Sequence, residues 1–410
     1  MKHIDEKFWG TEFNYLDEVT KLYDLPDYVN IHDVTLREGD QTPGCVLKTE
    51  EKIELAKELD DLGVDVIEMF AMVSQDDRDA LAELSKPGVL KHAKLASLSR
   101  ALPGDIDAVV KCGVKRVCME GPGNLWTNQN IIGIETEEQV IKSFVEAIKY
   151  AKNSGIEHVA VGAWDCARGT SLDFLEKFTK AIVEAGADEV CYADTFGFTL
   201  PWTVQHIIKK YREWAGENVA ISVHFHNDYG LATANSLAAV AAGASSVQVS
   251  MNGLGERFGN TPLDEVALHL ALTMNVKTDI KLEKLYPVSK KLEAMSKIAI
   301  PENKPVVGER GFKMGSGLVV DMLAKAEKLN MTNSGLPFLP ELVGRPPYEV
   351  VYGKGVGTNM VANFIKDMGL EATKEQSREI SELIKNEALM IKGLLPEFRV
   401  KEIINNHLQK

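Results

Sequence analysis

The chain has 410 residues, more than the roughly 250–300 at which a single core stops growing, so a large domain and a smaller one are expected. With 45% hydrophobic and 26% charged residues, its composition is that of an ordinary globular protein rather than a disordered or fibrous one. The net charge is −14 and no Lys/Arg run stands out, which argues against nucleic acid as a partner.

Cysteine usage and the N-terminal residues indicate a compartment. The five cysteines form no CxxC pair and are odd in number, so neither a disulfide framework nor a zinc knuckle is predicted. Charge is scattered through the first 19 residues, and no 18-residue apolar stretch occurs. We therefore expect a cytoplasmic protein with reduced thiols and no association with a membrane.

Eight short apolar runs rich in Val and Ile recur through the first two thirds of the chain. They lie at 29–35, 63–70, 94–99, 114–120, 156–163, 187–195, 218–226 and 244–251. Stretches with helical spacing separate them, such as 49–63, 137–155 and 172–186, each ending in a Gly that suits a helix C-cap. Alternating strands and helices predict a parallel sheet, and eight repeats favour a (β/α)8 TIM barrel of the α/β class. A doubly wound open sheet is the alternative fold.

The repeating pattern stops after about residue 275. The stretch 281–300 has helical spacing, 335–357 is spotted with Gly and Pro, and 372–408 returns to helical spacing. The predicted organisation is an N-terminal extension (1–27), a catalytic barrel (28–275) and mainly helical C-terminal subdomains (276–410).

Reactive groups of such a barrel lie at the C-terminal ends of its strands. The first strand leads into Arg37 and Glu38, and the seventh ends in His224 and His226. Two histidines at i and i+2 point to the same face, and with one carboxylate they form a three-ligand divalent metal site that keeps open positions. Alternatively, the histidines merely line the barrel with satisfied hydrogen bonds, and Arg37 forms a structural ion pair.

Further polar residues fall on the same rim. Glu120, Asp165, Asp194 and Thr195 end strands, although an acid there is often only a helix N-cap. Glycines in the loop 252–260 permit close backbone approach, and Asn260 could add a metal ligand. A plain loop is the alternative.

Together these motifs resemble the metal-dependent superfamily of 2-isopropylmalate, homocitrate, citramalate and Re-citrate synthases. DVTLREGDQ is similar to that family's first-strand motif, and the long motif that starts HFHNDYG and ends NGLGERFGN is similar to its second. The resemblance implies that Arg37 and Gln41 bind a 2-oxo acid. It assigns the metal to Glu38, His224, His226 and Asn260. Thr195, within ADTFGFTLP, would bind the substrate carboxylate.

Two departures alter the half of the site that would activate the acyl group. The family's tail reads roughly HESGIH, whereas this chain has Met314 and Val319 where the histidines would stand. The fifth strand usually ends in Glu within an S-x-E-D-A pattern, and AWDCA here offers Asp165. Asp165 could serve as the base, the acyl partner could differ, or a paralogous subunit could supply the missing residues.

The resemblance implies a Claisen-type condensation of an acyl-CoA, such as acetyl-CoA, with a 2-oxo acid. It also implies a divalent cation (Mn, Mg, Zn or Co) and a homodimer. A lyase of the same superfamily and a non-catalytic partner subunit remain alternatives. The loop after strand eight has no Cys, which weakens the comparison with 3-hydroxy-3-methylglutaryl-CoA lyases.

Overall fold

The computed structural model describes residues 4–409, which form two compact units. The first unit runs from Glu12 to Ile300, and the second combines residues 4–11 with 301–409. The domain limits given above, 28–275 and 276–410, stay predictions. Among residues 4–409, no helix combines the length and the apolar character needed to cross a bilayer.

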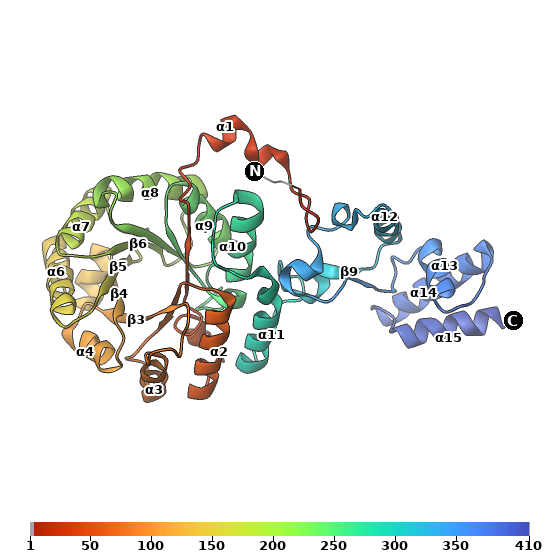
Figure 1. The fold of residues 1–410 in the computed structure, drawn as a ribbon, viewed down its shortest axis with the longest axis horizontal. Helices are drawn as coiled ribbons and strands as arrows, with labels where there is room; N and C mark the ends of the chain where they lie inside the picture. Colours follow the sequence, from red (N-terminus) through yellow and green to blue (C-terminus); the bar gives the residue numbers. More distant parts are fainter. Residues whose placement is uncertain (1–3, 410) are drawn as a thin grey trace. The chain divides into compact units, whose positions relative to one another are not determined.

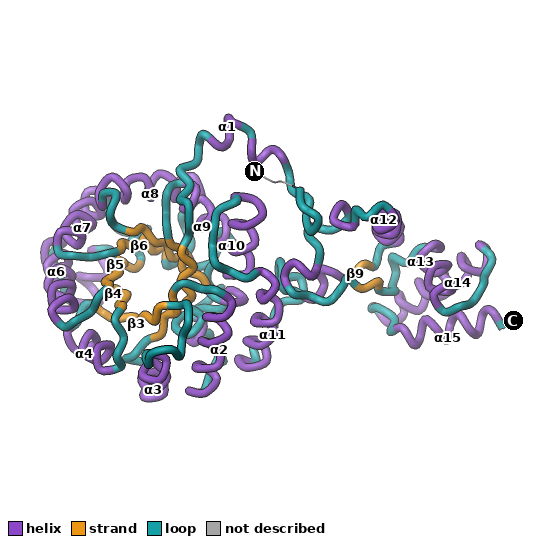
Figure 2. Tube along the Cα trace, in the orientation of Figure 1, coloured by secondary structure: helices purple, strands orange, loops and turns teal. Residues whose placement is uncertain are grey.

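The first unit contains the predicted barrel. Eight parallel strands close on themselves in sequence order, with β1 paired to both β2 and β8. Figure 2 shows this ring of strands inside a ring of helices. The strands are β1 (Asn30–Asp33), β2 (Val66–Met69), β3 (Lys94–Arg100), β4 (Arg116–Pro122), β5 (His158–Trp164), β6 (Glu189–Asp194), β7 (Ala220–Phe225) and β8 (Ser246–Val249). Each predicted run overlaps one strand, so the (β/α)8 prediction is confirmed and the open sheet is excluded.

The strands read as apolar runs because both of their faces are covered. One face packs against the outer helices, and the alternate residues point into the barrel, where Val66, Ala96, Leu98, Cys118 and Ala160 form an interior cluster. Closely packed side chains fill this part of the barrel, so the open positions lie at the strand ends.

The helices of the first unit follow from amphipathic spacing and from caps. In α7 (Leu172–Glu184), the side chain of Ser171 accepts a hydrogen bond from the Phe174 N–H, and the helix buries Phe178 and Ile182. The remaining α-helices, all but α5 labelled in Figure 1, are α1 (Asp17–Thr20), α2 (Thr49–Leu62), α3 (Gln75–Leu84), α4 (Pro103–Lys111), α5 (Leu125–Thr127), α6 (Glu137–Asn153), α8 (Pro201–Ala215), α9 (Ala232–Ala241), α10 (Leu263–His269) and α11 (Leu285–Ser296).

The second unit is mainly helical, in keeping with the helical spacing predicted within 276–410. Its helices are α12 (Gly317–Lys328), α13 (Thr358–Asp367), α14 (Lys374–Ile391) and α15 (Glu397–Leu408), and β9 (Lys313–Met314) pairs in parallel with β10 (Glu349–Val350). Its core gathers apolar residues from all four helices, such as Val320, Val361, Ile384 and Ile404.

Candidate metal centre

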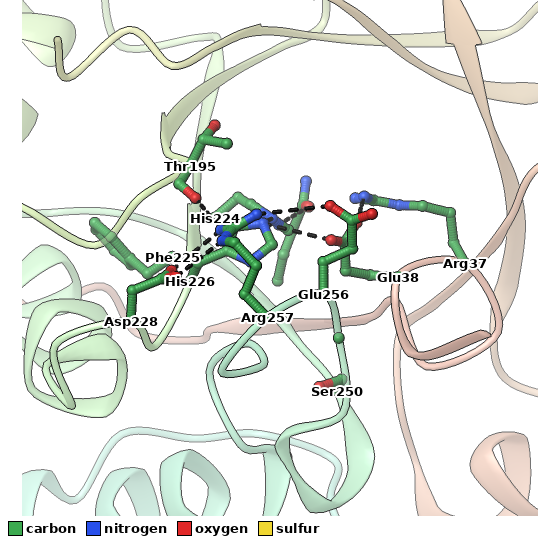
Figure 3. Close-up of polar contacts among 12 residues, drawn as sticks. Arg37, Glu38, Thr195, His224, Phe225, His226, Asp228, Ser250, Glu256 and Arg257 are labelled. Atoms are coloured by element: carbon green, nitrogen blue, oxygen red, sulfur yellow. Dashed lines mark hydrogen bonds and ion pairs between the residues drawn. The ribbon is translucent and has the colours of Figure 1, made fainter. Parts of the chain in front are cut away.

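Glu38, His224 and His226 meet at the C-terminal end of the barrel (Figure 3), where one ligand atom of each lies within 4.8 Å of the others. The two Nε2 atoms of the histidines are 3.2 Å apart. His226 Nε2 is 3.4 Å from Glu38 Oε1. All three side chains are buried, so the arrangement is a compact set of two imidazoles and one carboxylate of the kind that binds divalent metals.

Backbone geometry explains how residues so distant in sequence come together. His224 lies in β7 and His226 directly follows it, so their side chains point to the same side. Glu38 follows β1 in a tight turn, in which the Arg37 and Glu38 N–H groups both donate to the carbonyl of Val34. An isolated bridge between His226 and Asn260 brings the loop after β8 to the same place.

Burial keeps the two imidazoles in their neutral form, and a neighbouring amide orients one of them. Burial lowers the pKa of His226 to about 4. Burial, and then the nearby His226 and Arg37, lower the pKa of His224 well below its usual value. Nδ1 of His224 lies 2.9 Å from Oε1 of Gln248 in β8, which fixes the ring and leaves Nε2 toward Glu38 and His226. Neutral imidazoles are the form that binds a metal.

Arg37 lies at the centre of a group of carboxylates. Its Nε donates to Glu68 Oε1 in β2 at 2.6 Å, and its Nη1 pairs with Glu38. Its Nη2 is 3.9 Å from Glu120 Oε1 and has no hydrogen-bond partner among the described residues. Burial would lower the pKa of Arg37, but Glu68, Glu38 and Glu120 together raise it above its ordinary value. The guanidinium is therefore charged and keeps one donor for a ligand.

The charges at this end of the barrel do not balance. Glu38, Glu68 and Glu120 surround one guanidinium, so the carboxylates exceed the cations. A buried excess of negative charge costs free energy unless a cation or a proton offsets it. In addition, Oδ1 and Nδ2 of Asn260 are buried without a hydrogen-bond partner in residues 4–409. The residues present therefore fit a divalent cation held by Glu38, His224 and His226 with an oxygen of Asn260 nearby.

Thr195 and Gln41 differ in how they are placed. Thr195 follows β6, and its hydroxyl accepts a hydrogen bond from the Asp165 N–H at 2.8 Å. Arg257 pairs with both carboxylate oxygens of Asp228 and donates to the Thr195 carbonyl, which ties the loops after β6, β7 and β8 together (Figure 3). Gln41 ends a short turn at 39–41 and is exposed.

Asp165 lies after β5 in the left-handed backbone region, with φ of 56°. Arg168 donates to both of its carboxylate oxygens at 2.8 and 2.9 Å, and Asn124 Nδ2 donates to one of them at 3.0 Å. The structure thus places this acid in a bidentate ion pair and outside the Glu38–His224–His226 group.

Met314 and Val319 belong to the second unit. Met314 ends β9 and packs against the hydrophobic core of that unit, and Val319 lies in the first turn of α12. Neither side chain can transfer a proton.

Sequence reasoning missed two residues of the site, Glu68 and Gln248. Each lies on a strand next to the residue that it contacts, and nothing near the two motifs in sequence indicates the pairing. The available signal was an inward-facing polar residue in an otherwise apolar strand, which usually has a buried partner.

Comparison with known proteins identifies relatives over most of the chain. The family described as HMGL-like matches residues 28–292. The chain is 39% identical over 359 residues to the putative (R)-citramalate synthase of Archaeoglobus fulgidus, covering 87% of this chain and 71% of that protein. It is 36% identical to the homocitrate synthase of Methanopyrus kandleri, with 96% of each chain covered.

Among solved structures, the hydroxymethylglutaryl-CoA lyase of Bacillus subtilis superposes with a TM-score of 0.59 at 22% identity, covering 68% of this chain and 96% of that one. At this identity the likeness concerns the fold alone. The family match spans the whole barrel, and the homocitrate synthase matches nearly end to end. The chain therefore belongs to the HMGL-like family, which is part of the DRE-TIM superfamily.

Proposed function

We propose that this protein catalyses a Claisen-type condensation of an acyl-CoA, with acetyl-CoA as the first candidate, and a 2-oxo acid. The observation that carries the proposal is the unpartnered Nη2 of Arg37 beside the group formed by Glu38, His224 and His226. A buried donor next to three metal-ligand side chains suits a substrate that offers adjacent carbonyl and carboxylate oxygens. The relatives named citramalate and homocitrate synthases support the same reaction class.

Glu38, His224 and His226 would hold a divalent cation, with Asn260 as a further oxygen donor. When bound, such a cation acts as a Lewis acid that polarises the keto group of the oxo acid. Two imidazoles and a carboxylate suit Mn, Zn or Co, and Mg is also compatible with open positions filled by oxygens.

The remaining residues bind and orient the substrate. Arg37 would donate from Nη2 to the keto oxygen and stabilise the alkoxide that forms there, because its guanidinium is already fixed by Glu68 and Glu38. Thr195 and Gln41 are proposed to contact the substrate carboxylate. Asp165 stays a predicted catalytic residue that could serve as the base, although Arg168 and Asn124 hold its carboxylate in the structure.

Incubating the protein with Mn²⁺, acetyl-CoA and a panel of 2-oxo acids, while following free thiol, tests the proposal. We expect thiol release with at least one acid and none without the cation. If no 2-oxo acid gives thiol release with any of the cations, the proposal is contradicted.

Two other outcomes are distinguishable in the same assay. Pyruvate formation from hydroxy-oxo acids without thiol release would indicate a lyase. Metal binding without any turnover, restored by a paralogue that carries the missing histidines, would indicate a partner subunit. The homodimer and the cytoplasmic location predicted from the sequence also remain proposals.

A further inference from the structure

Glu120 is a carboxyl group at the C-terminal end of the barrel that the two sequence motifs leave without a role. It lies in β4, where Arg116 and Cys118 precede it by four and two residues on the same face. Arg116 pairs with Glu189 of β6, and Cys118 belongs to the interior cluster, so this face points into the barrel. Glu120 is therefore directed inward, close to the strand end.

Neither neighbour in register supplies a partner for the carboxyl group. On β5 the residue in register is Gly162, which has no side chain. On β3 it is Arg100, whose guanidinium turns away to Asp105 of α4, with Nε 2.8 Å from the carboxylate. The Glu120 side chain is 22% exposed, whereas that of Glu68 is fully buried. A substrate that enters from the strand ends can reach the carboxyl group.

The other acids near this end are held by strong partners. Arg168 holds Asp165, the backbone N–H groups of Phe198 and Thr199 hold Asp194, Arg257 holds Asp228, and Arg37 holds Glu38 and Glu68. The Glu120 carboxyl group accepts no hydrogen bond from another residue in the described part of the chain, and its one printed ion-pair contact is with Arg37 Nη2 at 3.9 Å. Its lone pairs are free to accept a proton.

We propose that Glu120 is the general base that removes a proton from the methyl carbon of the acyl-CoA. This inference rests on the condensation proposed above and fills the role left open by Met314 and Val319. The methyl C–H bond breaks, the proton passes to a Glu120 oxygen, and the electron pair forms an enolate with its charge on the thioester oxygen. The enolate carbon attacks the keto carbon, and the keto oxygen becomes an alkoxide that receives the proton. Water then cleaves the thioester and releases the CoA thiol.

The electrostatic surroundings suit this task. Burial raises the pKa of Glu120 to about 7; Arg37 lowers it, and Glu68 and Glu38 raise it. The Cys191 thiol of β6 is a further titratable group near Glu120, and its own pKa is raised by burial and by Glu120. A base is most effective when its pKa lies near the working pH. Activity should therefore fall on the acidic side of the pH profile, where the carboxylate becomes protonated.

The test compares wild type with Glu120→Gln and Glu120→Asp in the presence of Mn²⁺. Thiol release and exchange of acetyl-CoA methyl protons with D2O report the chemistry, and calorimetric titration with the 2-oxo acid reports binding. We expect Glu120→Gln to lower kcat about 10²–10⁴-fold, to lose methyl exchange and to keep oxo-acid affinity. Glu120→Asp should recover part of the rate with a shifted acidic limb. Glu157→Gln, an exposed glutamate outside the site, is the matched control and should match wild type.

The outcomes separate this inference from the proposed function. If wild type neither releases thiol nor exchanges methyl protons, both proposals fall. If wild type is active and Glu120→Gln has the same kcat and pH profile, only the role of Glu120 is overturned. If Asp165→Asn loses methyl exchange and Glu120→Gln keeps it, Asp165 and not Glu120 is the general base. Thermal unfolding of each variant shows that the fold is intact.

Discussion

The two ends of the barrel hold glutamates in opposite electrostatic settings. At the N-terminal end, Glu189 of β6 accepts a hydrogen bond from Arg116 at 2.5 Å and lies 3.2 Å from Nε2 of His158. Burial would raise its pKa, but the His158 hydrogen bond and the Arg116 charge lower it to about 2. At the C-terminal end, Glu120 shares one guanidinium with two other carboxylates, and its pKa is raised to about 7.

This difference separates a structural network from a functional one. The N-terminal end pairs its acid locally, so its charges stabilise the fold without a ligand. The C-terminal end has more carboxylates than cations and an Arg37 donor without a partner, so a cation and a substrate would complete it.

The largest expected effect is a loss of stability caused by a substitution at the N-terminal end of the barrel. Replacing Glu189 with Gln leaves the half-buried Arg116 without its carboxylate, and we expect a loss of about 3–5 kcal/mol in the free energy of unfolding. Because the folded pKa is depressed, this stabilisation is present above the unfolded pKa and is lost as the pH falls toward about 2. Urea unfolding at pH 7 and pH 3 measures the loss of stability and its dependence on pH, with Glu157→Gln as the control. Equal stability of Glu189→Gln and wild type would contradict the local pairing.

The next effect is on catalysis at the C-terminal end. Arg37→Lys keeps a charge but loses the planar guanidinium that contacts Glu68, Glu38 and a ligand together, so kcat/KM should fall about 10²–10³-fold. Arg100→Lys, an exposed arginine at the same end, should retain wild-type rates. A lysine variant with unchanged kcat/KM would show that the guanidinium geometry is unimportant.

A smaller effect is expected one step away from the metal ligands. Gln248→Leu removes the acceptor at Nδ1 of His224, and the affinity for Mn²⁺ should weaken about 10–100-fold. Gln248→Glu keeps an acceptor there and should retain most of the affinity. Titration with Mn²⁺, followed by electron paramagnetic resonance, measures the affinity of both variants. Equal affinities in the Leu variant and in wild type would show that the Gln248 contact does not support metal binding.

The sequence predicts the fold better than it predicts the electrostatics of the site. Strands covered on both faces read as apolar runs, and the pair His224 and His226 is visible because alternate residues share a face. The surroundings of Arg37 arise from strands β2 and β4, whose side chains meet only after the barrel closes. No local pattern identifies Glu68 or Gln248, since each is defined by a partner on a neighbouring strand.

The smallest effect contrasts the two glutamates directly. Glu120→Gln removes one of three carboxylates around Arg37, so the metal-free variant should be more stable than wild type at pH 8 by roughly 1 kcal/mol or more. The sign follows from the raised pKa, because the folded state disfavours the carboxylate form above about pH 7. Urea unfolding in the presence of a chelator measures this change. A destabilised Glu120→Gln would mean that Glu120, like Glu189, stabilises the fold through its pairing.

The C-terminal end of the barrel is interpreted as a place where a cation and a 2-oxo acid bind together. Calorimetric titration of the acid that gives thiol release, with and without Mn²⁺, tests this most directly. We expect measurable affinity only with Mn²⁺, and its loss in a double His224→Ala and His226→Ala variant. Equal affinity with and without the cation, or in wild type and the double variant, would contradict it.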